Sequence, residues 1–212
     1  MLVKEKIIAT FNHTYNFYCP EAYDNRAKPS HSRRSSRKKE SQVLVAEEYI
    51  RTLHDEVIQV YTDGTFKDGK TGAAAVFRNR GKYFLTIGAK IPRATNNIGE
   101  IYAIAIAVRR LVQEKVRRTT TCFFIDSEYC IGLFTQGWIP KKNAKLVELV
   151  KKLLNKFTKA DNITRVMWTP SHRGIEGNEV VDKAADFFRE GSFEVDMSTL
   201  DSEDSIVYDT KD

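Results

Sequence analysis

The sequence contains few cysteines and no long apolar run. Only 3 of its 212 residues are cysteines (Cys19, Cys122 and Cys130), and no two of them have a CxxC spacing. We therefore expect buried, reduced thiols in place of disulfides or zinc ligands. No apolar stretch reaches the ~20 residues that cross a membrane, and the N-terminus has no signal-peptide apolar segment or cleavage site. These absences predict an intracellular protein, in the nucleus or the cytoplasm, with no membrane partner.

An excess of negative charge is also absent, except at the C-terminus. The formal net charge is +6 at pH 7. Residues 1–54 carry 10 basic and 6 acidic groups, residues 55–191 carry 23 and 15, and residues 192–212 carry 1 and 7. A basic middle segment suits a polyanionic substrate, because cationic surfaces release counterions from phosphates when they bind. A solvated basic surface without that role explains the charge equally well.

The composition divides the chain into three segments. Residues 1–54 form an N-terminal extension whose polar, Ser-rich stretch 24–42 has too few apolar residues to offset the entropy of ordering. We predict that this stretch is a disordered basic arm, serving as a nuclear localisation signal, a phosphate-binding arm or a simple linker. Residues 55–191 are predicted to form one domain, because they hold enough apolar residues for a core. The acidic tail 192–212 is predicted to be disordered.

The order of the predicted elements indicates an α/β fold. Apolar runs separated by Gly- and Lys-rich turns predict a three-strand antiparallel meander, followed by strands that alternate with helices. A mixed five-stranded sheet flanked by helices on both faces follows, in the sequence order βββ-α-β-α-α-β-α. The strands are expected at 57–62, 72–78, 82–91, 120–126 and 163–170, and helices at 43–54, 97–115, 127–137, 144–158 and 176–190.

Two acidic residues stand at the ends of apolar predicted strands. Asp63 follows VIQVYT, and Asp126 follows TTCFFI. If the two strands are adjacent, the carboxylates are neighbours and repel each other unless a cation lies between them. Several carboxylates with only oxygen donors favour Mg²⁺ or Mn²⁺ over zinc. A cluster of acids on a basic domain is the arrangement that two-metal cleavage of a phosphodiester requires.

Two further acids lie on predicted helices, where the pattern alone gives them no special role. Glu100 occupies the first turn of the helix at 97–115, and a first-turn acid stabilises the helix dipole. Asp182 lies on the helix at 176–190, where an acid is ordinarily solvated. Their positions in the predicted elements therefore favour Asp63 and Asp126 as metal ligands, but they do not by themselves favour Glu100 or Asp182.

Four motif segments that contain all four acids lie in order along the chain. They are YTDGTF (61–66), NNIGEIYA (96–103), FIDSEYC (124–130) and WTPSHRGIEGNEVVDKAAD (168–186). Together they resemble the signature segments of type I ribonuclease H domains over about residues 57–190, and most closely those of non-LTR retrotransposons and related viral or cellular enzymes. The resemblance implies a ribonuclease H-like fold. It also implies endonucleolytic hydrolysis of the RNA strand of RNA–DNA hybrids with two Mg²⁺ ions, for which Mn²⁺ can substitute.

The resemblance also implies a set of catalytic residues. Asp63, Glu100, Asp126 and Asp182 match the carboxylates that bind the metal ions in this family. His172 matches the mobile histidine of the family, which is expected to assist proton transfer or product release. Its position in a Pro-, Ser- and Gly-rich loop and the near-neutral pKa of histidine suit that task. Without the motif, an ordinary surface histidine would be the simpler interpretation.

Substrate-binding residues are implied in the same way. Asn96 resembles the asparagine that contacts the minor groove and the 2′-hydroxyls of the RNA strand, which only RNA carries. Arg93 and Thr95 match positions that bind a phosphate of the DNA strand, and Asn178 matches a position near the metal site and the substrate backbone. Glu128 departs from the pattern, since many relatives carry a glutamine there, and its negative charge puts that substrate contact in doubt.

Two other functions stay open at this stage. One is a nuclease of the same fold that acts on DNA or on structured nucleic acid, against which Asn96 and the WTPSHRG segment argue. The other is a noncatalytic nucleic-acid-binding module, against which the presence of all four acids argues. We expect the chain to act as a monomer on an RNA–DNA hybrid, whether it is free-standing or part of a polyprotein.

Overall fold

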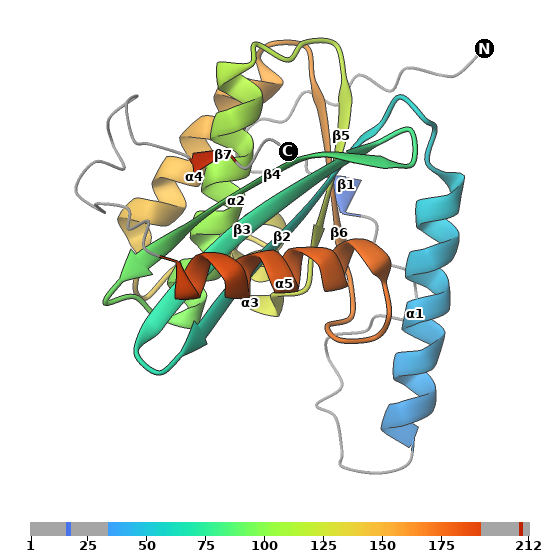
Figure 1. The fold of residues 1–212 in the computed structure, drawn as a ribbon. Coiled ribbons are helices and arrows are strands. Elements are labelled where there is room, and N and C mark those ends of the chain that lie inside the picture. Colours follow the sequence, from blue (N-terminus) through green and yellow to red (C-terminus); the bar gives the residue numbers. More distant parts are fainter. Residues whose placement is uncertain (1–15, 18–33, 192–207, 210–212) are drawn as a thin grey trace.

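A mixed β-sheet forms the centre of the computed structural model, which describes residues 16–17, 34–191 and 208–209 (Figure 1). The strand order across the sheet is β1-β6-β5-β2-β3-β4-β7. The strands are β1 (Asn16–Phe17), β2 (Ile58–Lys67), β3 (Lys70–Asn79), β4 (Lys82–Pro92), β5 (Thr120–Ile125), β6 (Ile163–Trp168) and β7 (Tyr208–Asp209). The helices are α1 (Arg34–Thr52), α2 (Asn96–Gln113), α3 (Glu128–Thr135), α4 (Ala144–Thr158) and α5 (Glu176–Glu190). The predicted α/β fold with five main strands is confirmed, and two strands of two residues each lie at the edges.

The sheet combines an antiparallel meander with a parallel half. Strands β2, β3 and β4 pair antiparallel in sequence, whereas β5 pairs parallel with β2 and β6 pairs parallel with β5. The β2–β3 hairpin turns at Asp68 and Gly69, which both have positive φ (51° and 75°). Positive φ at both central residues defines a type I′ turn, for which Asp-Gly is a favoured pair.

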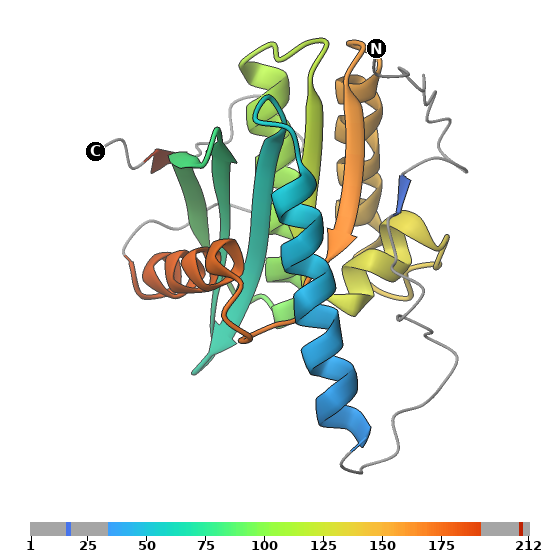
Figure 2. The ribbon, with the colours of Figure 1, turned by 90° about the vertical axis from the view of Figure 1, so that its right-hand side faces the viewer.

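The helices cover both faces of the sheet and bury a separate core on each (Figure 2). Helices α2, α3 and α4 pack on one face, and α1 and α5 pack on the other. Consecutive strand residues therefore point to opposite cores: Val60 belongs to the α2 side, and Tyr61 belongs to the α5 side, where its ring stacks on Phe124 at 4.6 Å. These two cores fix the sheet between two helical layers.

Strand β2 is longer than the sequence indicated. The strand was expected to end at residue 62, directly before Asp63, but β2 continues to Lys67 because its pairing with β3 continues that far. The parallel pairing of β2 with β5, by contrast, stops at Thr62 and Ile125. Asp63 therefore lies inside an antiparallel hairpin, at the residue where β2 loses its partner on the other side.

Helix α1 corrects the predicted extent of the disordered arm. The helix begins at Arg34, so residues 34–42 of the arm 24–42 are helical. The sequence from Arg34 to Thr52 contains neither proline nor glycine, and most of its polar residues are compatible with a helix. Ala46 is buried in the core on the α5 side, which attaches this helix to the sheet. Residues 1–15 and 18–33 lie outside the described part, and the domain boundary at residue 55 stays a prediction.

The predicted C-terminal tail is corrected at one point. Tyr208–Asp209 form β7, which pairs antiparallel with β4 at Ile87 and Gly88. The expectation of disorder is therefore wrong for these two residues, and it stays a prediction for residues outside the described part. Among the described residues, none of the helices is long and apolar enough to span a membrane.

Candidate active site

Three acids from different elements meet at one end of the parallel strand pair. Asp63 lies on β2, Asp126 directly follows β5, and Glu100 lies in the second turn of α2. The register that pairs Thr62 with Ile125 brings the next residues of both strands, Asp63 and Asp126, side by side. One carboxylate oxygen of each acid lies within 4.8 Å of one oxygen of each of the others. The neighbourhood of Asp63 and Asp126 that the strand ends suggested is therefore present.

Glycine allows α2 to come close enough to bring Glu100 to this group. A Cβ atom on Gly64 would overlap the backbone of Gly99 and Glu100. A Cβ atom on Gly99 would in turn lie 3.0 Å from the backbone oxygen of Gly72 on β3. Any larger residue at Gly64 would therefore push the start of α2 away from β2.

Asp63 and Glu100 are buried, Asp126 is half-buried, and the pKa values of the two buried acids are raised. The pKa of Asp63 is raised to about 7, first by burial and then by the charges of Asp126 and Asp182. The pKa of Glu100 is raised well above its ordinary value, first by burial and then by the charges of Asp63 and Asp126. Burying like charges together is unfavourable unless a cation neutralises them. The group thus has the donor atoms and the excess of negative charge that suit a hard divalent cation.

Asp126 is held from two sides. The Trp168 indole N–H donates to its backbone oxygen at 3.0 Å, and the Asn178 amide donates to a carboxylate oxygen at 3.5 Å. Asn178 is itself buried and accepts a hydrogen bond from the Thr169 hydroxyl at 3.3 Å. The sequence did not single out Trp168 or Thr169, although both belong to the motif at 168–186. Glu128 lies exposed in the first turn of α3, two residues beyond Asp126.

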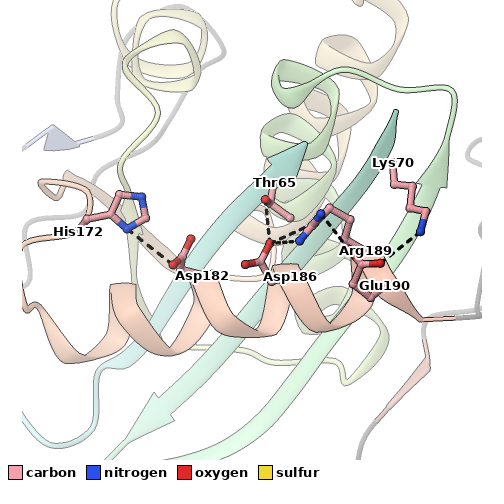
Figure 3. Close-up of polar contacts among 7 residues, drawn as sticks. All are labelled: Thr65, Lys70, His172, Asp182, Asp186, Arg189 and Glu190. Carbon is pink, nitrogen blue, oxygen red and sulfur yellow. Dashed lines mark hydrogen bonds and ion pairs between the residues drawn. The ribbon is translucent and has the colours of Figure 1, made fainter. Parts of the chain in front are cut away.

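Asp182 and His172 form a second group beside the first. Asp182 lies on α5 and is outside the set of acids that approach within 4.8 Å of one another. His172 Nδ1 lies 3.7 Å from Asp182 Oδ2 (Figure 3). The pKa of Asp182 is raised, first by burial, and the neighbouring His172 opposes that rise. The histidine side chain is 69% exposed, so it can reach solvent and ligand alike.

The predicted substrate residues gather at the start of α2. Thr95 is the N-cap of this helix, and its backbone oxygen accepts two helix amides at 3.0 Å. The side-chain amide of Asn96 donates to Glu100 Oε1 at 3.4 Å. Arg93 precedes them with a positive φ of 54°. The side chains of all three residues are exposed, next to the most deeply buried acid of the site.

One acid near the site was not anticipated. Asp186 lies one turn beyond Asp182 on α5, and its charge raises the pKa of both Asp63 and Asp182. It accepts a hydrogen bond from the Thr65 hydroxyl at 3.1 Å and pairs with Arg189 at 2.9 Å (Figure 3). The Arg189 side chain is 6% exposed, so this charge is fixed against the sheet. The spacing of four residues from Asp182 was the available signal, since it places both acids on one helix face.

The strand order and the acid group together define a ribonuclease H-like α/β protein whose carboxylates can hold a metal ion. The family model for RNase H matches residues 55–188, and the chain therefore belongs to the RNase H family. RNase H1 from the halophilic archaeon Halobacterium salinarum NRC-1 has a similar fold, with a TM-score of 0.52 and 20% sequence identity. The match covers 62% of this chain and 96% of the archaeal one. At that identity, the likeness supports the fold alone.

Proposed function

We propose that this protein hydrolyses the RNA strand of RNA–DNA hybrids in a reaction that depends on divalent metal ions. The observation that carries the proposal is the group formed by the buried Asp63 and Glu100 with the half-buried Asp126, in which one carboxylate oxygen of each acid lies within 4.8 Å of the others. Membership of the RNase H family gives the class of nucleic acid on which such a group acts. The products expected for this family carry 5′-phosphate and 3′-hydroxyl ends.

The donor set suits two Mg²⁺ ions, with Mn²⁺ as a substitute. Asp63, Glu100 and Asp126 would hold them, and Asp182 would complete the set from α5. Bound divalent ions supply an activated water and neutralise the charge that develops on the phosphate and the leaving oxygen. The hydrogen bonds from Asn178 and Trp168 restrict Asp126 and so keep its carboxylate directed at this position.

The remaining residues would bind the hybrid and move a proton. The exposed side chains of Arg93, Thr95 and Asn96 lie at the start of α2, where the positive end of the helix dipole favours phosphate. Asn96 would distinguish RNA by contacting its 2′-hydroxyls. His172 is exposed and lies close to Asp182, so its imidazole can accept a proton at the site and release it to water.

A cleavage assay on three substrates tests the proposal. The full chain is incubated with labelled RNA–DNA hybrid, duplex RNA and duplex DNA, each with Mg²⁺ and with EDTA. We expect cutting of the RNA strand of the hybrid only, and none in EDTA. Equal cutting of all three substrates would favour a less selective nuclease. Binding of hybrid without cutting would favour a noncatalytic module.

A matched pair of variants tests the site. Asp63→Asn removes one buried metal ligand and is expected to reduce the cleavage rate by at least about a hundredfold. Asp68→Asn makes the same change five residues further on, in the exposed β2–β3 turn, where asparagine also tolerates positive φ. Cleavage should be unchanged in Asp68→Asn. Near-normal cleavage by Asp63→Asn would refute the assignment of the site.

A further inference from the structure

A pocket of about 910 Å³ lies at the end of the sheet away from the acids. It is formed at the start of β2 and β5 and at the β3–β4 turn, which lie at the same end of the sheet (Figure 1). Asp126 follows the other end of β5, and a six-residue strand spans roughly 20 Å. Its lining includes Val57, Ile58, Arg80, Lys82, Phe84 and Arg118. The pocket is thus separate from the candidate active site.

Cations dominate the charge of this pocket. Arg80, Lys82 and Arg118 line it, and Glu56 is the one acid among the lining residues. Among the residues whose side chains are described, 43–191, none pairs with any of the three cations. Unpaired cations that converge on one cavity create a positive potential that attracts anions.

Arg80 occupies the first central position of a tight turn, with its backbone in the left-handed region. Arg80 and Gly81 have φ values of 49° and 73°, which define a second type I′ turn, between β3 and β4. The β2–β3 turn fills the same two positions with Asp68 and Gly69. Asn, Asp and Gly are preferred at the first position, whereas arginine is strained there. Arg80 therefore makes this turn less stable than asparagine would, and it is one of the residues that line the pocket.

An exposed aromatic ring lies beside these cations. Phe84 is 56% exposed, and its ring lies 6.1 Å from that of Phe77 at an interplanar angle of 50°. Phe77 is 1% exposed and belongs to the core on the α2 side. The Phe84 ring is therefore supported from one side by a fixed ring while much of its surface faces solvent. A fixed aromatic ring next to arginine and lysine is the arrangement on which unpaired bases stack.

We propose that this pocket binds a single-stranded segment of nucleic acid. A base stacks on Phe84, and the phosphates that flank it are bound by Arg80, Lys82 and Arg118. The volume lies in the range of small-ligand pockets, roughly 300–1,000 Å³, which suits a base with the phosphates beside it. An acidic peptide would satisfy the same cations, whereas a nucleotide offers both phosphates for the cations and a flat base for the ring. The site acts without the acid group, so it does not rest on the cleavage proposed above.

Binding of a labelled oligothymidylate of about ten nucleotides to the full chain tests this site. Fluorescence anisotropy is measured in EDTA, where no cleavage can contribute. Arg80→Asn places a preferred residue in the turn, so its melting temperature should equal or exceed that of the wild type. Its affinity should fall several-fold, and the salt dependence of log K should become shallower by about 0.7. A gain in stability together with a loss of binding cannot result from misfolding.

Two control variants separate the site from the general charge and apolar surface. Lys70→Gln removes one cation at the opposite end of β3, where Lys70 pairs with Glu190 at 3.2 Å, and should leave the affinity unchanged. Phe84→Leu keeps an apolar side chain but removes the ring, and should weaken binding about fivefold or more. Phe187→Leu makes the same change at another exposed ring, on α5, and should have no effect.

Two results would overturn the proposal. In the first, Arg80→Asn and Phe84→Leu both bind the oligothymidylate as tightly as the wild type. In the second, the oligothymidylate does not bind, but a synthetic peptide with the acidic sequence of residues 192–212 binds the wild type and fails to bind the two variants. The pocket would then be a site for acidic peptides.

Discussion

The burial of Asp63 beside other acids has a cost to folding. Its pKa is raised from 3.8 to about 7 because it is buried beside other acids. Between about pH 4 and pH 7, Asp63 is therefore protonated in the folded protein and ionised in the unfolded chain. In the absence of metal, the free energy of unfolding that depends on this group falls as the pH rises through that window. A bound divalent cation would reverse the effect.

Because the free energy of unfolding falls as Asp63 ionises, we predict that Asp63→Asn stabilises the metal-free protein. At pH 8 the variant should exceed the wild type by about 2–4 kcal/mol in free energy of unfolding, and the difference should vanish near pH 4. Urea denaturation in EDTA at several pH values measures it. Adding Mg²⁺ should stabilise the wild type and not the variant. A variant less stable than the wild type at pH 8 would mean that burial and the neighbouring charges do not disfavour the ionised form of Asp63.

Asn178 is predicted to position Asp126 through its side-chain amide. Asn178→Ala removes the hydrogen bond to the carboxylate and leaves the buried Thr169 hydroxyl without its partner. Loss of such an outer contact should weaken Mg²⁺ binding by about 10–100-fold while the fold is retained. Isothermal titration calorimetry measures the affinity. Asn155→Ala, on α4, is the control, and equal affinities in both variants would contradict the role given to Asn178.

At the scale of the elements, two identical dipeptides differ in structure: one lies within a strand, and the other forms a turn. Asp63-Gly64 and Asp68-Gly69 both have the composition of a hairpin turn. The predicted strand stopped at the first dipeptide, and a Gly- and Lys-rich turn was expected between residues 62 and 72. The structure places it at the second, because β2 continues to pair with β3 as far as Lys67. Gly64 is explained by the close approach of α2 instead. Local pattern could not separate the two glycines, because the contact that distinguishes them is with a helix more than 30 residues later in the chain.

That explanation predicts a large effect of a single methyl group. Gly64→Ala should move the start of α2 and destabilise the protein by about 3 kcal/mol or more, since the added atom meets backbone and not a flexible side chain. Cleavage should fall as well, because Glu100 moves with the helix. Gly191→Ala is the control, since its Cβ would make ordinary contacts at 3.4–3.5 Å. Thermal denaturation of both variants measures the difference.

At the scale of the whole molecule, α1 is part of the folded unit that follows it. Its Ala46 is 1% exposed and lies in the core with Tyr61 and Phe124. Residues 1–54, which include α1, were predicted to be an extension of the domain. Composition shows where apolar residues are few, but it does not show which face of the fold a helix packs against. The described helix therefore covers a face of the sheet that α5 alone would leave open (Figure 2).

A matched pair of charges tests this packing. Ala46→Asp buries a charge in the core and should lower the free energy of unfolding by about 3 kcal/mol or more. Leu44→Asp places the same charge two residues earlier, where the side chain is 66% exposed, and should change stability by less than about 0.5 kcal/mol. Urea denaturation compares the two. Equal stability would show that α1 does not pack on the sheet in solution.

The sequence by itself determined the α/β class, the order of the main elements and the neighbourhood of Asp63 and Asp126. Period-two and helical spacings are local, so the bounds of α4 and α5 were predicted to the residue. The motif likeness also named Asn178, Asp182 and His172; Asn178 contacts Asp126, His172 lies 3.7 Å from Asp182, and the roles given to all three stay predictions. The monomeric state and the compartment stay predictions.

Only the tertiary structure decided which acids approach one another and what holds them. It brings Glu100 into the group through a glycine contact and leaves Asp182 outside the set within 4.8 Å. It also gives Asn96 a contact with Glu100, fixes Asp186 with Arg189 and gathers three cations at the far end of the sheet. Each of these facts depends on distances between elements that are remote in sequence, and those distances are set by the packing of the two cores.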